Sequence, residues 1–505
     1  MISELFNGFA QLFTVELLSL AVLGVLLGSV VGVLPGIGPI GAMSILLGLT
    51  TQIGPTGSLI LFAGVYYGAA YGGSTTAILL NIPGESSSVM TAVDGHEMTK
   101  KGRAGAALTV AAVGSFIAGT VSVIGLTFLA PTLGSAAVKL GPPEYLALTI
   151  AGLGLLVVLN PGKLGKSMMM VSLGLVIAYV GIDPLTATSR FTFGLTELSG
   201  GISFVPLVMG LFGVAEVLDE LIRPQRKQRV QSPRLRELMP TREESRRALP
   251  AALRGTGIGF VLGLVPGPAA VTSTFASYVT ERKLSKNRSE FGHGAVEGVA
   301  GPESANNAAA GAAFIPLLVL GIPFAPTMAL ILSALLLNGI VPGPTFIQDQ
   351  SELFWTVIAA MYVANVMLLL LNLPLVGIFT RLLSVPRGIL MPIVLGLCVI
   401  GVYAANNSLF DIGVMIVAGF VGLALRRADL NPAPLVLAVV LAPTLESSLR
   451  QTLSLSGGDV GSYLAGRPIV MSLLASILIA LVMRAYLRRH APTALDEQVE
   501  TVDHK

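Results

Sequence analysis

The chain has little charge and almost no cysteine. Only 12% of its 505 residues are charged and 53% are hydrophobic, and the charged fraction is about half that of a soluble domain. This composition excludes an ordinary soluble enzyme, a disordered protein and a nucleic-acid binder. Since the one cysteine, Cys398, lies in an apolar run, disulfide scaffolds, iron–sulfur clusters and CxxC zinc sites are excluded. The four histidines are scattered, so no His-based metal site is expected.

Long apolar runs dominate what is present. They recur from Leu17 to Leu487, and their lengths predict an all-α polytopic membrane protein with about ten to twelve transmembrane helices plus shorter half-spans. The 58 glycines and 30 prolines are interleaved with these runs instead of gathering in linkers. That distribution predicts broken helices and close helix packing.

Positive charge concentrates in one central segment. Residues 223–247 contain nine Lys or Arg and three acids, which predicts a cytoplasmic loop, with an anionic-lipid site as the alternative reading. Basic residues near the end predict a cytoplasmic C-terminus. We therefore divide the chain into a first membrane repeat (1–222), a basic cytoplasmic loop (223–249), a second membrane repeat (250–425), and C-terminal helices with a short cytoplasmic tail (426–505).

An internal repeat flanks the basic loop. Residues 28–36 and 259–267 are identical at five of nine positions, and both end in Pro-Gly. A second, looser pair follows in the same order: residues 71–84 and 301–323 each carry a polar cluster, an apolar segment and Ile-Pro. We expect the helices to break at Pro35, Gly36, Pro39, Gly72, Gly73, Pro83, Gly84, Pro266, Gly267, Pro268 and Pro323.

Two broken motifs in the same order in each half are typical of a secondary transporter with internal repeats. The alternative is that Gly-rich segments resemble one another by chance or serve helix packing. Broken helices offer free N–H groups to a carboxylate, and hydroxyls and amides can complete its shell. The predicted substrate-binding residues are Ser74, Thr75, Thr76, Asn81, Ser304, Asn306 and Asn307.

Freed carbonyls and Asn oxygens suit a coupling cation. The predicted ion-coupling residues are Gly36, Gly38, Glu303 and Asn306; Glu303 could instead cap a helix or face water. No catalytic residue, no cofactor and no metal other than Na⁺ is expected. Glu85 is interpreted as a loop residue at a hairpin end. Asp94-Gly95 is a turn pattern, which predicts a cytoplasmic loop there.

At these motifs the chain resembles the large membrane subunit of tripartite tricarboxylate transporters. The matching segments are 32–39, 71–84, 94–98, 301–307 and 314–323, although Phe324 stands where the first copy has Gly84. The resemblance implies elevator-like ion-transporter architecture, with inverted repeats and re-entrant helical hairpins, in a bacterial inner membrane. It further implies a small membrane subunit of about four spans, a periplasmic solute-binding protein, a carboxylate substrate such as citrate, and coupling to Na⁺ or H⁺. On the same resemblance, the predicted polar residues surround the substrate or ion.

Three other readings stay open. A stand-alone carboxylate:cation symporter would need no binding protein. An intramembrane enzyme is disfavoured, because Ser74 follows two glycines but has no histidine at a convincing spacing. A channel would conduct without saturating, and paired broken motifs fit a carrier better.

Overall fold

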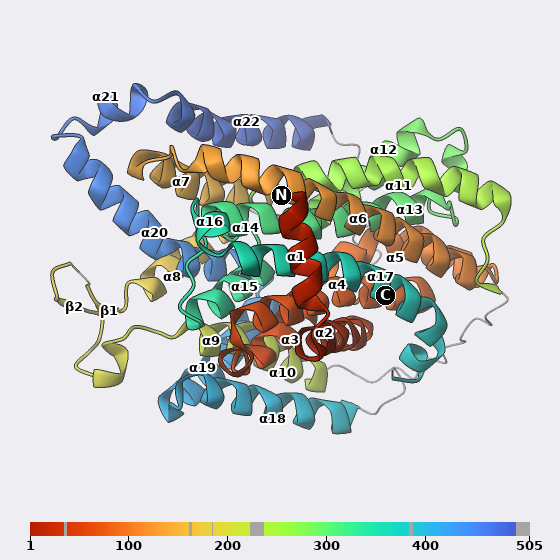
Figure 1. Ribbon diagram of the computed structural model, residues 1–505, viewed down its shortest axis with the longest axis horizontal. Helices are drawn as coiled ribbons and strands as arrows, with labels where there is room; N and C mark the ends of the chain where they lie inside the picture. The colour runs from red at the N-terminus through yellow and green to blue at the C-terminus, as the bar shows by residue number, and fades with distance from the viewer. Residues whose placement is uncertain (35–37, 161–163, 184, 223–236, 383–386, 491–505) are drawn as a thin grey trace.

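The computed structural model describes residues 1–34, 38–160, 164–183, 185–222, 237–382 and 387–490, and it is almost entirely helical (Figure 1). The strands in these ranges form one short antiparallel ribbon of β1 (Gly181–Ile182) and β2 (Ser189–Arg190), with Gly181 opposite Arg190. The predicted all-α polytopic class is confirmed. Pro35, Gly36 and residues 223–236 of the basic loop lie outside the described residues, as do residues 491–505.

The part of the chain before the basic loop forms ten α-labelled helices and a π-helical turn. They are α1 (Ile2–Leu12), α2 (Val15–Val33), α3 (Gly38–Leu47), α4 (Thr50–Leu80), α5 (Val89–Lys100), α6 (Ala104–Ala137), α7 (Pro142–Leu159), α8 (Leu164–Ala178), α9 (Phe204–Val208), the π-helix η3 (Met209–Val214) and α10 (Ala215–Ile222). Single 3₁₀ turns stand at Ser86–Ser88 and Thr196–Leu198.

The part after the basic loop is built in the same way. Its helices are α11 (Arg242–Gly263), α12 (Ala269–Leu284), α13 (Glu297–Ala312), α14 (Phe314–Leu320), α15 (Pro326–Leu337), α16 (Phe346–Asp349), α17 (Ser351–Leu382), α18 (Arg387–Asn406), α19 (Leu409–Arg427), α20 (Ala433–Leu455), α21 (Val460–Ala465) and α22 (Pro468–His490). A 3₁₀ turn, Arg288–Glu290, precedes α13. Local chemistry sets the start of α11, where Thr241 and Glu244 form a capping box.

Eight of the described helices are long and apolar enough to cross a membrane. Four further apolar helices are shorter, with 10–17 residues: Gly38–Leu47, Leu164–Ala178, Pro326–Leu337 and Leu390–Asn406. The sequence predicted about ten to twelve spans. Gly38 begins α3 and Pro326 begins α15, and both helices are too short to span alone.

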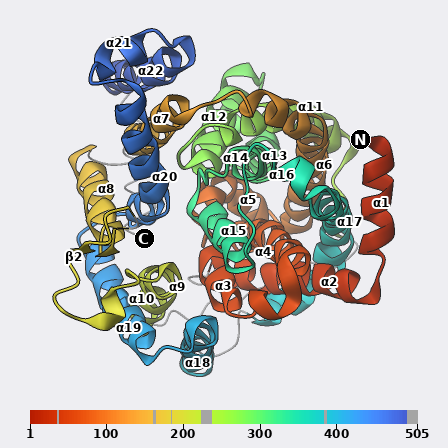
Figure 2. The ribbon, with the colours of Figure 1, turned by 60° about the vertical axis from the view of Figure 1, so that its left-hand side comes forward.

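The helices fall into two groups that alternate along the chain. Figure 2 shows α1–α6 lying with α11–α17, whereas α7, α8 and α20–α22 lie together on the other side. Contacts between α8 and α20, α7 and α20, and α7 and α22 hold the second group together. Each half of the chain therefore supplies helices to both groups.

Glycines at four-residue spacing allow the same close packing in both halves. On α2, Gly24, Gly28 and Gly32 face α4 so closely that an added Cβ would lie 2.2–2.6 Å from the carbonyl oxygens of Leu61, Val65 and Ala69. On α11, Gly255, Gly259 and Gly263 approach the carbonyl oxygens of Gly301, Ala305 and Ala309 on α13 in the same way. The sequence alignment of 28–36 with 259–267 thus pairs residues that make equivalent contacts. The inverted symmetry and the elevator arrangement stay predictions.

We expect Gly259→Ala to destabilise the fold and Gly257→Ala, on the same helix, to leave it unchanged. A Cβ at Gly259 would lie 2.1 Å from the Ala305 carbonyl oxygen, whereas a Cβ at Gly257 would have nothing within 4 Å. Forcing α11 and α13 apart should cost about 1–3 kcal/mol. Thermal melting in detergent measures both variants. Equal melting temperatures for the two would refute the packing role.

One predicted pair of helix breaks is wrong. Gly72 and Gly73 lie inside α4, which continues to Leu80, and they serve close packing: a Cβ on Gly72 would lie 2.4 Å from the Ser29 carbonyl oxygen. The break within α4 is at Gly54, where φ is 68° and ψ is 173°, next to Pro55. A glycine in a membrane helix can either break the helix or allow a neighbouring helix to pack closely, and composition alone does not distinguish these two roles.

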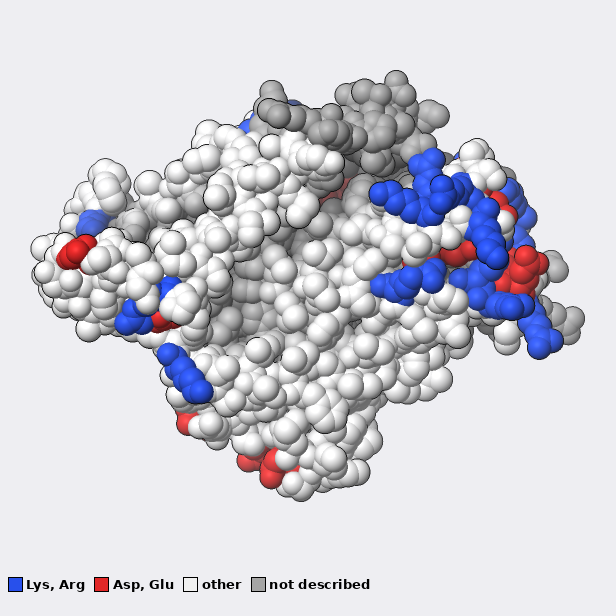
Figure 3. Space-filling view, turned by 90° about the horizontal axis from the view of Figure 1, so that it is seen from above, with Lys and Arg blue, Asp and Glu red and all other residues white. Residues whose placement is uncertain are grey.

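Basic side chains gather at one end of the molecule (Figure 3). The exposed members that the structure describes are Lys100, Lys101, Arg242, Arg246, Arg282, Lys283, Lys286 and Arg288. An ion pair between Arg103 and Glu244 joins the α5–α6 turn to α11 at this end. By the positive-inside rule, this end is predicted to be cytoplasmic.

Candidate functional site

A buried carboxyl side chain lies where four helices meet. Glu303 of α13 is 1% exposed. Its Oε2 accepts hydrogen bonds from Ser74 of α4 (2.6 Å) and Thr91 of α5 (3.0 Å). Its Oε1 accepts from Ser115 of α6 (3.1 Å) and from Asn307 Nδ2 (3.2 Å). We call these five residues the Glu303 cluster.

The many small residues of α13 explain why this polar helix can be buried. Every residue of α13 is buried. Its small residues permit this: Gly301 meets α11, and a Cβ on Gly114 of α6 would lie 2.7 Å from Ser304 Oγ. Since no face of the helix is left to solvent, each of its polar side chains needs a partner inside the protein.

A small cavity adjoins the Glu303 cluster. Its volume is about 20 Å³, and its lining includes Tyr71, Ser74, Ser115, Glu303 and Asn372. A space of this size holds one water-sized occupant. Because sites for organic ligands are typically about 300–1,000 Å³, this cavity is too small for a carboxylate such as citrate.

The segments that follow α4 (residues 81–85) and α14 (residues 321–325), which we call the two fold-backs, begin in the same way. Asn81, with φ of 56°, ends α4 before Ile82-Pro83, and Gly321, with φ of 70°, ends α14 before Ile322-Pro323. The left-handed residue therefore precedes Ile-Pro, so Phe324 at the position of Gly84 does not prevent the turn. The Gly84 N–H donates to the Gly73 carbonyl oxygen at 3.4 Å.

The second Pro-Gly break contacts the second fold-back. Pro266, Gly267 and Pro268 separate α11 from α12, and Gly267 has φ of 138°. Its N–H donates to the Phe324 carbonyl oxygen at 3.3 Å. In the first half, Gly38 has φ of 59° and Pro39 lies in the first turn of α3.

Comparison with known proteins identifies the family. A model of the tripartite tricarboxylate transporter TctA family matches residues 18–437. The chain belongs to this family. That stretch includes both Pro-Gly motifs, the segments after α4 and α14, and the whole Glu303 cluster.

Two relatives come from Agrobacterium vitis. One, named as an uncharacterised 52.8 kDa protein in the TAR-I ttuC' 3' region, is 48% identical over 475 residues, which is 94% of each chain. The other, named as an uncharacterised protein in the TAR-II ttuC' 3' region, is 49% identical over 225 residues, covering 45% of this chain and 93% of the relative. No solved structure matches the chain.

In this TctA-family chain, the predicted polar residues lie in different surroundings. Ser74, Glu303 and Asn307 meet in the Glu303 cluster, while Asn306 Nδ2 donates to Glu85 Oε1 at 3.4 Å. The hydroxyls of Thr75 and Thr76 donate to the carbonyl oxygens of Tyr71 and Gly73 in their own helix. Ser304 is buried and its Oγ has no hydrogen-bond partner in the described ranges, and Asn81 is exposed at the end of α4. Their functional roles stay predictions.

The sequence reasoning missed three polar members of this region. Thr91 and Ser115 complete the Glu303 cluster, and Asn372 of α17 lines the cavity. Each is a single polar residue in an apolar or small-residue stretch. No local pattern separates them from packing residues, so only the tertiary fold brings them together.

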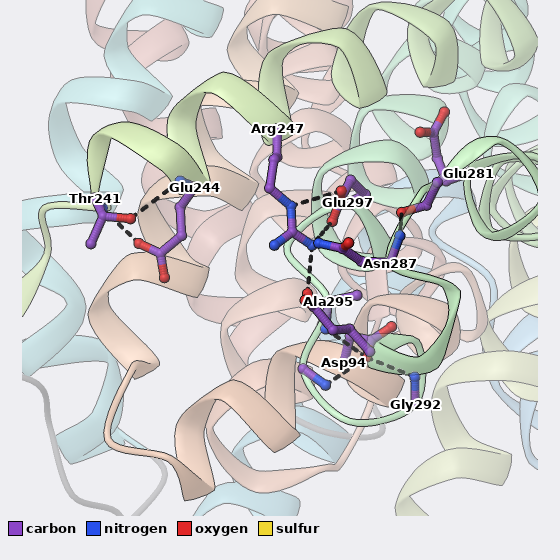
Figure 4. Close-up of polar contacts among 12 residues, drawn as sticks. Asp94, Thr241, Glu244, Arg247, Glu281, Asn287, Gly292, Ala295 and Glu297 are labelled. Atoms are coloured by element: carbon purple, nitrogen blue, oxygen red, sulfur yellow. Dashed lines mark hydrogen bonds and ion pairs between the residues drawn. The ribbon is translucent and has the colours of Figure 1, made fainter.

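Asp94 lies inside α5 and is buried, so its interpretation as a loop residue is wrong. Figure 4 shows its carboxylate meeting the segment before α13, where Oδ1 accepts from the backbone N–H groups of Gly292, Gly294 and Ala295 at 2.7–2.9 Å. Next to it, Arg247 of α11 pairs with Glu297 at 2.7 Å. The Asp94 hydrogen bonds join the two halves of the family fold, and the Arg247–Glu297 pair ties α11 to the start of α13.

A separate ion-pair group joins the β1–β2 ribbon to α20. Asp183 Oδ2 accepts from Arg450 Nη2 at 2.7 Å and lies 3.5 Å from Arg190 Nη2. Hydrogen bonding to Arg450, and then to the Leu185 N–H, holds the pKa of Asp183 well below its usual range. A carboxyl with a lowered folded-state pKa stabilises the fold above its unfolded-state pKa, and this is lost as the pH falls through the folded-state value.

We expect Asp183→Asn to lower the melting temperature by several degrees at about pH 7 and by less at about pH 3, because part of the wild-type contribution is lost once unfolded Asp protonates while the folded carboxyl stays ionised. Melting of both chains at the two pH values measures the difference. Asp429→Asn is the control: that side chain is 96% exposed in its pair with Lys166, so little change is expected. A deficit that is the same at both pH values would refute the electrostatic explanation.

Proposed function

We propose that the chain is the large permease subunit of a tripartite transporter that takes up a carboxylate by ion-driven secondary transport. The observation that carries this is the family match across residues 18–437, which contains every broken segment and buried polar group described above. We further propose that the substrate is a tricarboxylate such as citrate, or a related di- or monocarboxylate, and that Na⁺ or H⁺ drives its uptake.

The proposed partners are a small membrane subunit of about four spans and a periplasmic solute-binding protein, in a bacterial inner membrane. The exposed basic end supports an orientation in which residues 100–103 and 242–246 face the cytoplasm. In that orientation, a binding protein would deliver substrate at the opposite face. The C-terminus is proposed to be cytoplasmic.

The geometry supports a carrier that must change shape. The cavity of about 20 Å³ beside Glu303 is too small for a tricarboxylate, and access to this buried place from water requires the helices around it to separate. At the two fold-backs, a residue with left-handed backbone and a nearby proline end a helix. We propose that the helices move relative to one another at these two points. A carrier of this kind saturates with substrate, whereas a channel does not.

Reconstitution tests the proposal. Copurification after mild crosslinking should recover a small membrane subunit and a binding protein with the chain. Vesicles containing the membrane subunits should accumulate labelled citrate, or another carboxylate that the binding protein retains, only when that protein and an inward Na⁺ or H⁺ gradient are both present. Accumulation by this chain alone would favour the stand-alone symporter. Uptake that does not saturate would favour a channel.

A further inference from the structure

The Glu303 carboxyl group is buried and is contacted by neutral groups. All four hydrogen bonds to it from the described residues come from hydroxyls or an amide. Glu303 is also the one carboxyl side chain among the described residues that line the adjoining cavity. Burying a carboxylate without a positive partner costs several kcal/mol. The site therefore attracts a cation or a proton.

A second carboxylate lies beside the first. Neighbouring amides of α13 contact both acids: Asn307 donates to Glu303, and Asn306 donates to Glu85 on the fold-back after α4. Like charges repel strongly in an interior of low dielectric constant. An incoming carboxylate substrate would add more negative charge here, and the donors of Ser74 and Asn307 already serve Glu303. Binding of an anion next to Glu303 and Glu85 is therefore unfavourable.

An independent feature also indicates a cation. Asn372 of α17 is 5% exposed and lines the same cavity. Its Nδ2 donates to the Leu368 carbonyl oxygen at 3.0 Å, but its Oδ1 has no partner among the described residues. A buried oxygen without a donor costs about 1–3 kcal/mol. An amide oxygen beside a carboxylate is the type of ligand that hard cations prefer.

We propose that the cavity between Glu303 and Asn372 binds the monovalent cation, Na⁺ or H⁺, that drives transport, and that the carboxylate substrate binds elsewhere. This inference rests on the proposed function for its role in coupling. A volume of about 20 Å³ accepts one dehydrated ion or one water that bears a proton. The hydroxyls of Ser74, Thr91 and Ser115 can turn from donors to Glu303 into oxygen ligands of Na⁺, since a hydroxyl offers both a proton and lone pairs.

Cation binding is measured first, without any carboxylate present. The full-length chain, with the subunits that copurify, is titrated with radioactive Na⁺, and the infrared band of a protonated carboxyl is followed against pH. If Na⁺ is the ion, Glu303→Gln should weaken Na⁺ binding by more than about tenfold, and Asn372→Leu by about tenfold. If H⁺ is the ion, wild type should show no Na⁺ binding, and Glu303→Gln should remove the infrared band. Asp429→Asn, at an exposed position outside the site, should match wild type in both.

Labelled-carboxylate binding and vesicle uptake are then measured on the same samples. Either cation result, together with a loss of gradient-driven accumulation in Glu303→Gln, supports the site. Glu303→Gln with wild-type Na⁺ binding and an unchanged infrared band overturns it. Loss of carboxylate binding with unchanged cation binding also overturns it, because the residue would then hold the substrate.

If no carboxylate is transported by wild type while Glu303 still governs cation binding, the proposed substrate class fails and the cation site stands. Size-exclusion profiles identify misfolded variants; if Glu303→Gln misfolds, Asn372→Leu and Ser115→Ala decide.

Discussion

Asn307→Leu should abolish carboxylate uptake while the amount of chain in the membrane stays at the wild-type level. The Asn307 amide donates to Ser115 Oγ at 2.7 Å and to Glu303 Oε1 at 3.2 Å. Leucine fills a similar volume but removes the amide donor from the buried Glu303 side chain and from the Ser115 hydroxyl. A hydrogen bond to a charged group contributes about 1.5–3 kcal/mol, which corresponds to roughly 10- to 150-fold in binding of the ion that the cluster holds.

The matched control is Asn365→Leu. Asn365 is 2% exposed, like Asn307, but it donates to the Phe116 carbonyl oxygen and the Thr120 hydroxyl and lies outside the Glu303 cluster. We expect its uptake to fall by less than about tenfold, as for a structural hydrogen bond. Asn306→Leu, which removes the donor to Glu85, should also abolish uptake. Uptake at the wild-type rate in both Asn306 and Asn307 variants would remove these amides from the site.

Part of the candidate site could be predicted from the sequence because it consists of polar residues in otherwise apolar segments. Ser74, Glu303 and Asn307 are polar residues within apolar or small-residue segments, and such residues are costly in a membrane unless they serve a site. The structure brings these three together by hydrogen bonds. It does not do the same for Thr75 and Thr76, since adjacent helical residues point in different directions and their hydroxyls satisfy the backbone of α4.

Other features could not be predicted because their cause is distant in the sequence. An Asp-Gly pair favours a turn, yet Asp94 and Gly95 lie within α5. The Asp94 carboxylate accepts hydrogen bonds from backbone N–H groups that are about two hundred residues away in the sequence. Glu85 follows Pro-Gly and reads as a loop residue, but Asn306 brings it to α13. The interleaving of glycines with apolar runs predicted close packing, although it could not identify Gly54 as the glycine that breaks α4.

Asp94→Ala should destabilise the folded protein more than any other single change considered at this interface. The substitution leaves the N–H groups of Gly292, Gly294 and Ala295 without their acceptor. An unsatisfied buried group costs about 1–3 kcal/mol. The Ala295 N–H is buried and the other two are part-buried, so the expected loss is roughly 2–3 kcal/mol. Because the 292–295 segment leads directly into α13, its displacement should also disturb the Glu303 cluster. Thermal melting and uptake are both expected to fall.

Asp94→Asn distinguishes the hydrogen bonds from the charge. The amide oxygen of Asn can occupy the position of Oδ1 and accept the same three N–H groups, so this variant should melt close to wild type and well above Asp94→Ala. If the acceptor holds α5 to the second half of the chain, uptake should follow the same order: wild type, Asp94→Asn, Asp94→Ala. Equal destabilisation by Asn and Ala would show that the negative charge, and not the three hydrogen bonds, maintains the contact between the halves.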